Sequence, residues 1–256
     1  MTTLFLAVWL SSCNHYYYVS NVQNVPLFRE KNDLRLSGTF GGGDRSNCTE
    51  VQDAYSFPRN IGIIANFMSA KGGQVSDSTN WAKGNYFEGA IGYYKPIGKF
   101  GVFEIYGGLG GSNQHHQYAV NSVFNQYDHS YSGTSDLSFT KLFVQPSFGM
   151  ALKGFDFAFS TRISRLSFNE IDNNINRQID ESQFNNLNTI ARKKMYLFLE
   201  PAITIRGGWE YIKMQFQFST ASYILNPDIY FEPYHFSIGL YITIAERFRK
   251  DVPKDQ

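Results

Sequence analysis

KLFVQPSFGM (residues 141–150) and FDFAFSTRI (residues 155–163) decide the fold of this chain. Both segments alternate apolar and polar side chains with a period of two, which is the pattern of a β-strand with one apolar face. The alternating apolar face falls on even positions in the first segment and on odd positions in the second. This change of parity predicts an antiparallel hairpin with a two-residue turn at Gly154-Phe155, where the leading glycine suits a type II′ turn. Gly208-Trp209 predicts a second hairpin of the same kind.

The same alternation predicts ten strands along the chain. They fall at about residues 33–42, 49–57, 60–70, 85–95, 99–110, 137–152, 155–168, 194–206, 210–223 and 233–246. The connections between them alternate strictly between very short ones and long polar ones. The short connections lie near residues 57–60, 96–98, 154–155 and 208–209, and the long ones at 71–84, 111–136, 169–193 and 224–232.

These connection lengths predict a transmembrane barrel, because such barrels have short periplasmic turns and long extracellular loops. We therefore predict an all-β protein, a transmembrane antiparallel up-and-down β-barrel of about ten strands with both chain ends on the periplasmic side. Eight or twelve strands remain alternatives, because the segment 51–57 places Asp53 on the face of its apolar residues. A short helix near residues 183–192 is expected within the asparagine-rich loop.

Composition excludes one class of partner and is typical of a β-rich fold. The net charge of +1 gives no electrostatic reason to expect nucleic acid. Aromatic residues make up 17% of the chain, and no run approaches the length of a membrane-spanning helix. A soluble barrel or sandwich would share these features. Aromatic residues at strand ends favour the membrane, where they would form interfacial girdles: Tyr86/Phe87, Tyr93/Tyr94, Tyr196, Trp209/Tyr211 and Tyr234/Phe236.

The last predicted strand carries a recognisable pattern. Its Ser237-x-Gly239-x-x-Ile242-x-Ile244 resembles the β-signal of outer-membrane barrels, the closing-strand motif that the barrel assembly machinery recognises. Residues 33–248 therefore resemble outer-membrane β-barrel proteins of the Gram-negative type. Members of that group often end on an aromatic residue, whereas residues 249–256 form a charged tail that we expect on the periplasmic side.

The N-terminus resembles a bacterial lipoprotein signal. Leu10-Ser11-Ser12-Cys13 matches a lipobox, which implies a signal peptide at 1–12 and a lipid, palmitate included, on Cys13. Residues 13–32 have no clean period, and we interpret them as a lipidated tether at the periplasmic face. The resemblance places the protein in the bacterial outer membrane, anchored at Cys13, with its long loops outside the cell.

Charged residues on the predicted inward faces indicate a lumen closed by ion pairs, because buried charges must be paired and a ten-stranded barrel is narrow. The predicted network comprises Arg35, Glu88, Glu104, Lys141, Arg162, Glu200, Arg206 and Lys213. Glu88 and Glu104 are expected as diagonal neighbours across one hairpin. They could share a proton or a cation, but pairing of each with a lumen base is favoured.

No motif in the chain points to a cofactor, a metal or a catalytic centre. His115-His116 and His129 in the third long loop suggest a barrel hydrolase or acyltransferase only weakly, because their spacing matches no known motif. We expect a non-enzyme with a structural or binding role through its long extracellular loops, in contact with outer-membrane lipid and an extracellular ligand. An accessory subunit that docks on another outer-membrane barrel is the alternative, and a small pore is less favoured.

Overall fold

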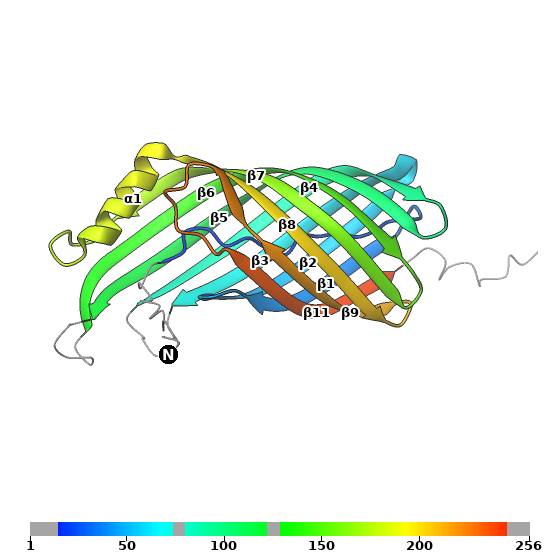
Figure 1. Cartoon of the computed structure of the whole chain (residues 1–256), viewed down its shortest axis with the longest axis horizontal. Helices are drawn as coiled ribbons and strands as arrows, with labels where there is room; N and C mark the ends of the chain where they lie inside the picture. The colour runs from blue at the N-terminus through cyan, green and yellow to red at the C-terminus, as the bar shows by residue number, and fades with distance from the viewer. Residues whose placement is uncertain (1–14, 74–79, 122–128, 245–256) are drawn as a thin grey trace, which may run out of the picture.

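The computed structural model describes residues 15–73, 80–121 and 129–244 and confirms the predicted ten-stranded antiparallel barrel (Figure 1). Its strands are β1 (Leu34–Gly42), β2 (Ser46–Phe57), β3 (Ile61–Gly73), β4 (Trp81–Ile97), β5 (Gly101–Asn121), β6 (His129–Ala151), β7 (Phe155–Asn173), β8 (Met195–Gly208), β9 (Ile212–Thr220) and β11 (Tyr234–Ile244). The ring closes where β1 pairs with β11. A short strand, β10 (Ser222–Leu225), pairs with β8 beyond the end of β9, so the predicted strand 210–223 is divided at Ala221.

The two ends of the barrel differ, as the connection lengths predicted. The β2–β3, β4–β5, β6–β7 and β8–β9 connections are each three residues long and lie at one end, which we call the short-turn end. The opposite end, which we call the long-loop end, carries the other connections, of which the β1–β2 connection is also only three residues long. Among the described residues, no helix has the length and apolar character needed to cross a bilayer.

The predicted turns at Gly154-Phe155 and Gly208-Trp209 are both displaced. The turn between β6 and β7 centres on Lys153-Gly154, because Leu152 N–H donates to the Phe155 carbonyl at 2.9 Å. The turn between β8 and β9 lies two residues later than predicted, at Glu210-Tyr211, because Trp209 N–H donates to the Ile212 carbonyl at 2.9 Å. Both shifts leave residues of opposite parity paired, so the predicted faces of these strands are unaffected.

The strands run farther at the long-loop end than predicted. β5 continues to Asn121 and β6 begins at His129, so most of the predicted loop 111–136 is an antiparallel ladder. Beyond the apolar belt neither face needs apolar side chains, so the alternation that marks a strand disappears while backbone pairing continues. The asparagine-rich loop after β7 contains the expected helix, α1 (Glu181–Lys193), whose buried Leu187 and Ile190 pack into an apolar cluster at this end.

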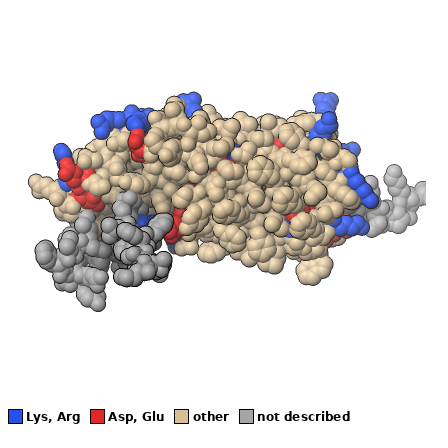
Figure 2. Space-filling view, in the orientation of Figure 1, with Lys and Arg blue, Asp and Glu red and all other residues tan. Residues whose placement is uncertain are grey.

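The wall has a polar inner face and an apolar outer face, as a lipid-embedded barrel requires. On the face shown in Figure 2, charged side chains gather toward the two ends and the belt between them carries few. The predicted girdles are correct for six of their nine residues. Phe87, Tyr93, Trp209, Tyr211, Tyr234 and Phe236 face outward, whereas Tyr86, Tyr94 and Tyr196 are buried inside. Adjacent residues of a strand face opposite sides, so only one of each adjacent pair can join the outer face.

Residues 15–28, which we call the lumen plug, lie inside the barrel and not outside it as the predicted tether. All but Tyr16 and Val19 of this segment are buried, and Figure 1 shows it as the dark-blue trace within the strands. The plug begins at the long-loop end, where Tyr17 hydrogen bonds to Gln183 of α1. It finishes at the short-turn end, where Arg29 donates to the Gly98 carbonyl and β1 then begins. Residue 15 therefore lies at the long-loop end, whereas the sequence predicts this segment at the end that carries the short turns.

Candidate functional site

The lumen plug is extended and has few backbone partners of its own, so side chains of the wall satisfy its peptide groups. Gln23 and Gln217 of β9 bond reciprocally, because Gln23 N–H donates to Oε1 at 2.7 Å and Gln217 Nε2 donates to the Gln23 carbonyl at 2.8 Å. Val22 N–H donates to both carboxylate oxygens of Glu50 at 3.0 Å. Four further plug carbonyls accept hydrogen bonds from wall side chains. Ser20 accepts from His235 and Asn24 from Gln145. Val25 accepts from Arg206 and Pro26 from Tyr241. The plug is thus fixed along its whole length.

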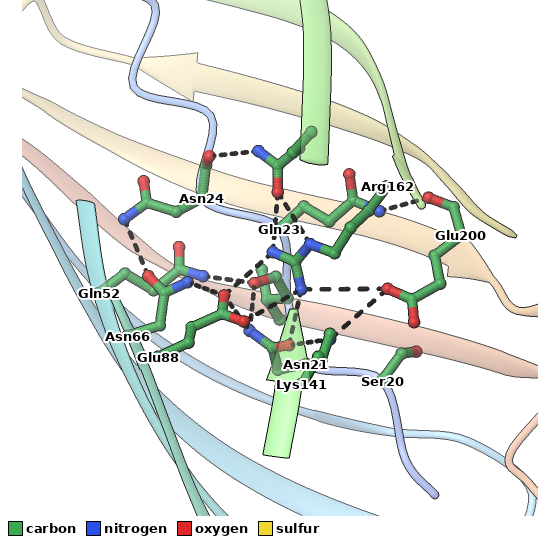
Figure 3. A network of polar contacts seen from close by, with 12 residues as sticks. Ser20, Asn21, Gln23, Asn24, Gln52, Asn66, Glu88, Lys141, Arg162 and Glu200 are labelled. Atoms are coloured by element: carbon green, nitrogen blue, oxygen red, sulfur yellow. Dashed lines mark hydrogen bonds and ion pairs between the residues drawn. The ribbon is translucent and has the colours of Figure 1, made fainter. Parts of the chain in front are cut away.

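Arg162 of β7 is the hub of the lumen centre (Figure 3). Its Nη2 lies 3.0 Å from Glu88 Oε1, and its Nε donates to Gln145 Oε1 at 3.1 Å. Its Nη1 donates to Oδ1 of the plug residue Asn21 at 2.8 Å. Asn21 in turn donates from Nδ2 to Glu88 at 2.9 Å. One plug side chain therefore bridges a buried ion pair whose members belong to β4 and β7, with two strands between them in the wall.

Lys141 of β6 and Glu200 of β8 extend this centre. Lys141 Nζ donates to Tyr18 Oη at 2.9 Å and lies 3.7 Å from Glu200 Oε2. The Tyr18 hydroxyl donates to the same carboxylate. Two bases and two acids thus meet with balanced charge, and none of their side chains is more than 1% exposed. Balance matters here because an unpaired charge in such a place costs several kcal/mol.

A second polar group occupies the short-turn end of the lumen. Asp156 of β7 lies 2.6 Å from Lys213 Nζ and 3.9 Å from Arg206 Nη1. The Arg206 guanidinium stacks 3.8 Å from the centre of the Tyr241 ring. Beside this group, a polar cleft encloses about 750 Å³ of space, part of it open to solvent. Charged side chains at this end are therefore close to water.

Each residue predicted for the lumen network has its side chain on the inner face, but the eight do not form one network. Arg162, Glu88, Lys141 and Glu200 meet at the centre, and Arg206 and Lys213 meet near Asp156. Arg35 pairs with Asp33 at 2.8 Å, and Glu104 accepts from Phe28 N–H at 2.9 Å.

The expected neighbourhood of Glu88 and Glu104 is wrong. In the β4–β5 ladder Glu88 lies opposite Gly110 and Glu104 lies opposite Tyr94. The reason is the turn, which follows Ile97 and so falls later in the chain than the predicted 96–98. Glu88 pairs with a lumen base, whereas Glu104 binds the plug backbone, so each carboxylate has its own partner.

The residues of the predicted assembly signal all lie on β11, the strand that closes the barrel against β1. Ser237 faces inward, while Ile242 and Ile244 face outward. A Cβ at Gly239 would lie 2.1 Å from the Gly38 carbonyl oxygen, so the closing seam requires glycine there. Cys13, the predicted lipidation site, and the charged tail 249–256 lie outside the described residues.

The histidines proposed for a loop lie on strands. His115 Nδ1 contacts Asp136 Oδ1 at 2.7 Å in an exposed position, and His116 is buried with its Nδ1 3.2 Å from His15 Nδ1. His129 begins β6, and its side chain lies outside the described residues. Within the ranges that the structure describes, no three His, Cys, Asp or Glu side chains gather closely enough to hold a metal.

A cleft opens at the long-loop end between the plug and strands β3–β5. It encloses about 780 Å³, part of it open to solvent, and His15, Val19, Met68, Tyr86 and His116 are among its lining residues. Its lining is mostly apolar, and it also includes imidazole, amide and basic side chains. Such a surface can bind an apolar group that carries hydrogen-bonding atoms.

Sequence reasoning missed the plug and its main acceptor in β2, Glu50. Ser46, Cys48, Glu50, Gln52, Ala54 and Ser56 form the inner face of β2, and Asp53 faces outward. The signal was present, since these even positions are small or polar like other inner faces. The Asn, Gln and Tyr residues of the plug carry no period, because an extended segment surrounded by wall on all sides has no solvent face.

No family model matches this chain, and no curated protein matches it by sequence. Solved structures, in contrast, match this chain in fold. The translocator domain of the autotransporter NalP from Neisseria meningitidis has a TM-score of 0.50 at 8% identity, covering 85% of this chain and 89% of that one. An outer-membrane channel from Pseudomonas putida F1 has a TM-score of 0.44 at 7% identity, covering 88% of this chain and 100% of that one. The outer-membrane protease OmpT from Escherichia coli has a TM-score of 0.40 at 10% identity, covering 83% and 95%. The first of these likenesses supports the outer-membrane barrel fold, and none of the three shows a specific activity.

Proposed function

We propose that this chain is an outer-membrane lipoprotein whose barrel is closed by its own N-terminal segment and whose long-loop end binds a ligand outside the cell. The observation that carries the proposal is the lumen plug, which occupies the space an open channel would need. The plug is bound by peptide hydrogen bonds along its length and by a buried, charge-balanced centre. A barrel closed in this way offers its loops and the cleft at the long-loop end, not a pore, as its working surface.

Planar-bilayer recording tests whether the lumen is closed. We expect no steady conductance from the purified protein, because the buried plug and the ion pairs at its centre occupy the lumen. Replacing Gln23 with alanine removes its side-chain bond to the Glu200 carbonyl and leaves the backbone bonds to Gln217, so it should give at most brief openings. Large, long-lived openings in the unaltered protein would overturn the proposal.

Thiol labelling tests on which side of the membrane the plug begins. In a background that carries Cys13→Ser and Cys48→Ser, Tyr16→Cys lies at the long-loop end and Lys31→Cys at the short-turn end. An impermeant maleimide added to intact cells should label the first and not the second, because long loops of outer-membrane barrels face outward. The reverse labelling pattern would mean that the short-turn end, and not the long-loop end, faces the outside of the cell.

Lipidation of Cys13 is part of the proposal and needs its own test. Metabolic labelling with an alkyne palmitate analogue should tag the unaltered chain and not Cys13→Ser, while Cys48→Ser should remain tagged because Cys48 is buried in the barrel. The Cys13→Ser chain should still fold in the outer membrane, since the belt of apolar side chains holds it there.

The second candidate, an accessory subunit of a larger complex, is favoured by one feature of the outer wall, the outward-facing carboxylate of Asp53.

A further inference from the structure

Asp53 is a carboxylate on the apolar outer wall. It lies on β2 opposite Leu36 of β1 and Ala65 of β3, and its side chain is exposed between Val51 and Tyr55. Among the described residues, no side chain or peptide group forms a hydrogen bond or ion pair with its carboxylate; the contact to Asn24 is made by its backbone carbonyl. Asp53 therefore faces the surroundings of the barrel without a partner.

The position of Asp53 is near mid-height in the apolar belt. At the short-turn end the outer face of β2 ends with the aromatic Phe57, and toward the long-loop end it turns polar at Thr49. Four other strands of the wall, β4 to β7, turn polar toward the same end, at Asn85, Asn113, Thr140 and Arg165. An ionisable side chain at this depth is costly in lipid and usually has a partner or a function.

A groove lies beside Asp53 on the same outer wall. It encloses about 940 Å³, widely open, along the seam of β1, β2 and β11, and Gly38 forms part of its lining. A Cβ at Gly38 would meet nothing within 4 Å, so the glycine leaves open space in the wall. Apolar side chains border the groove: Leu36, Phe40, Val51, Ile238, Leu240 and Ile242. The wall thus offers a shaped apolar surface with one carboxylate at its side.

We propose that this wall binds a second membrane protein of different sequence, which presents a lysine or arginine at mid-height of the bilayer. A lipid acyl chain would fill the groove and leave Asp53 unpaired. A second copy related by a two-fold axis would bring two Asp53 carboxylates together, which repel each other. Arg165 of another copy cannot pair with Asp53 in the same bilayer, because it lies much farther from Phe155, the short-turn end of its strand, than Asp53 lies from Phe57. A partner with its own lysine or arginine would neutralise the Asp53 carboxylate and fill the groove.

Site-specific photo-crosslinking in native membranes tests this interface. A photoreactive phenylalanine replaces Val51 beside Asp53, and Phe159 on the far side of the barrel serves as the matched control. We expect one discrete protein adduct from position 51 and none from position 159. Asp53→Asn should lower the yield of that adduct about tenfold, since it removes the charge and keeps the shape. Heat-modifiable migration of each variant on gels shows that the barrel has folded.

The identity of the adduct then decides. A different membrane protein cross-linked next to a lysine or arginine, with partial recovery of yield when Asp53→Lys is combined with an aspartate at that position, supports the proposal. An adduct with the mass of two copies, an adduct with lipid alone, equal yields at positions 51 and 159, or a yield insensitive to Asp53→Asn overturns it. Because none of these readouts depends on conductance, they remain valid if the lumen proves to be open.

Discussion

The centre of the lumen and its short-turn end contain the same kinds of side chain but stabilise the barrel differently. At the centre, Arg162 and Glu88 are completely shielded, and the plug residue Asn21 bridges them. At the short-turn end, Asp156 is shared by Lys213 and Arg206 beside a polar cleft that opens to solvent. We therefore expect the loss of a charge to cost more at the centre, where the plug excludes water, than at the short-turn end beside the cleft.

A barrel lumen can be closed by side chains of the wall alone or by a segment that fills it. Side chains of the wall alone would have to reach across the lumen to pair with each other. Here the plug fills the middle, so each wall side chain needs only to reach the plug, and long side chains such as Arg162 and Lys141 meet it at hydrogen-bond distance. The ion pairs at the centre thus depend on the plug as much as on the wall.

Arg162→Met should give the largest effect. It leaves Glu88 buried without its cation, and we expect a loss of about 3–5 kcal/mol in the free energy of unfolding. Denaturant unfolding of the detergent-solubilised protein, followed by tryptophan fluorescence, measures it. Adding Glu88→Gln to the variant should recover part of the loss, since it removes the stranded charge. A loss below about 1 kcal/mol would mean that water reaches the centre.

Asn21→Ala tests the plug side of the same contact. Its amide bonds to Arg162, Lys141 and Glu88, and hydrogen bonds to charged groups are worth about 1.5–3 kcal/mol. Asn24→Ala is the matched control, because Asn24 bonds through its side chain to the neutral Asn66 and a backbone carbonyl, and it should cost about 1 kcal/mol. Equal losses in the two variants would contradict the special role of the centre.

Lys213→Met should cost less than either change at the centre, about 1 kcal/mol, because Asp156 keeps Arg206 and gains water from the cleft. The same unfolding measurement applies. A loss as large as that of Arg162→Met would show that the short-turn end is as dry as the centre, and the contrast between the two regions would fail.

Glu232→Gln should give the smallest effect, which is a change in how the Tm of the protein varies with pH. Glu232 precedes β11 at the long-loop end, accepts from Asp44 N–H at 2.6 Å, and burial raises its pKa. A raised carboxyl pKa means that the folded state holds the proton more tightly, so this contribution to stability is present at acidic pH and is lost as pH rises past the ordinary carboxyl range. The Tm of the unaltered protein minus that of Glu232→Gln should therefore fall as pH increases. A constant or rising difference would contradict the raised pKa.

Sequence reasoning succeeded where a residue's role depends on its own strand. The faces of β6, β7 and β8 follow from alternation alone, and that is why Lys141, Arg162 and Glu200 could be placed in the lumen. It failed where the role depends on registration with another segment. Glu88 and Glu104 are not neighbours, because the β4–β5 turn lies later in the chain than predicted and a shift in the turn moves every cross-strand partner.

The sequence by itself determined the closed antiparallel wall, because period-two alternation and connection lengths are local properties that each segment carries. Only the tertiary structure decided what fills the barrel and where the chain begins to cross it. Residues 15–28 lack a period and carry side chains that suit either water or a polar lumen. Their burial comes from the combined inner faces of all ten strands, which no single segment contains, and from the peptide groups that those faces are able to satisfy.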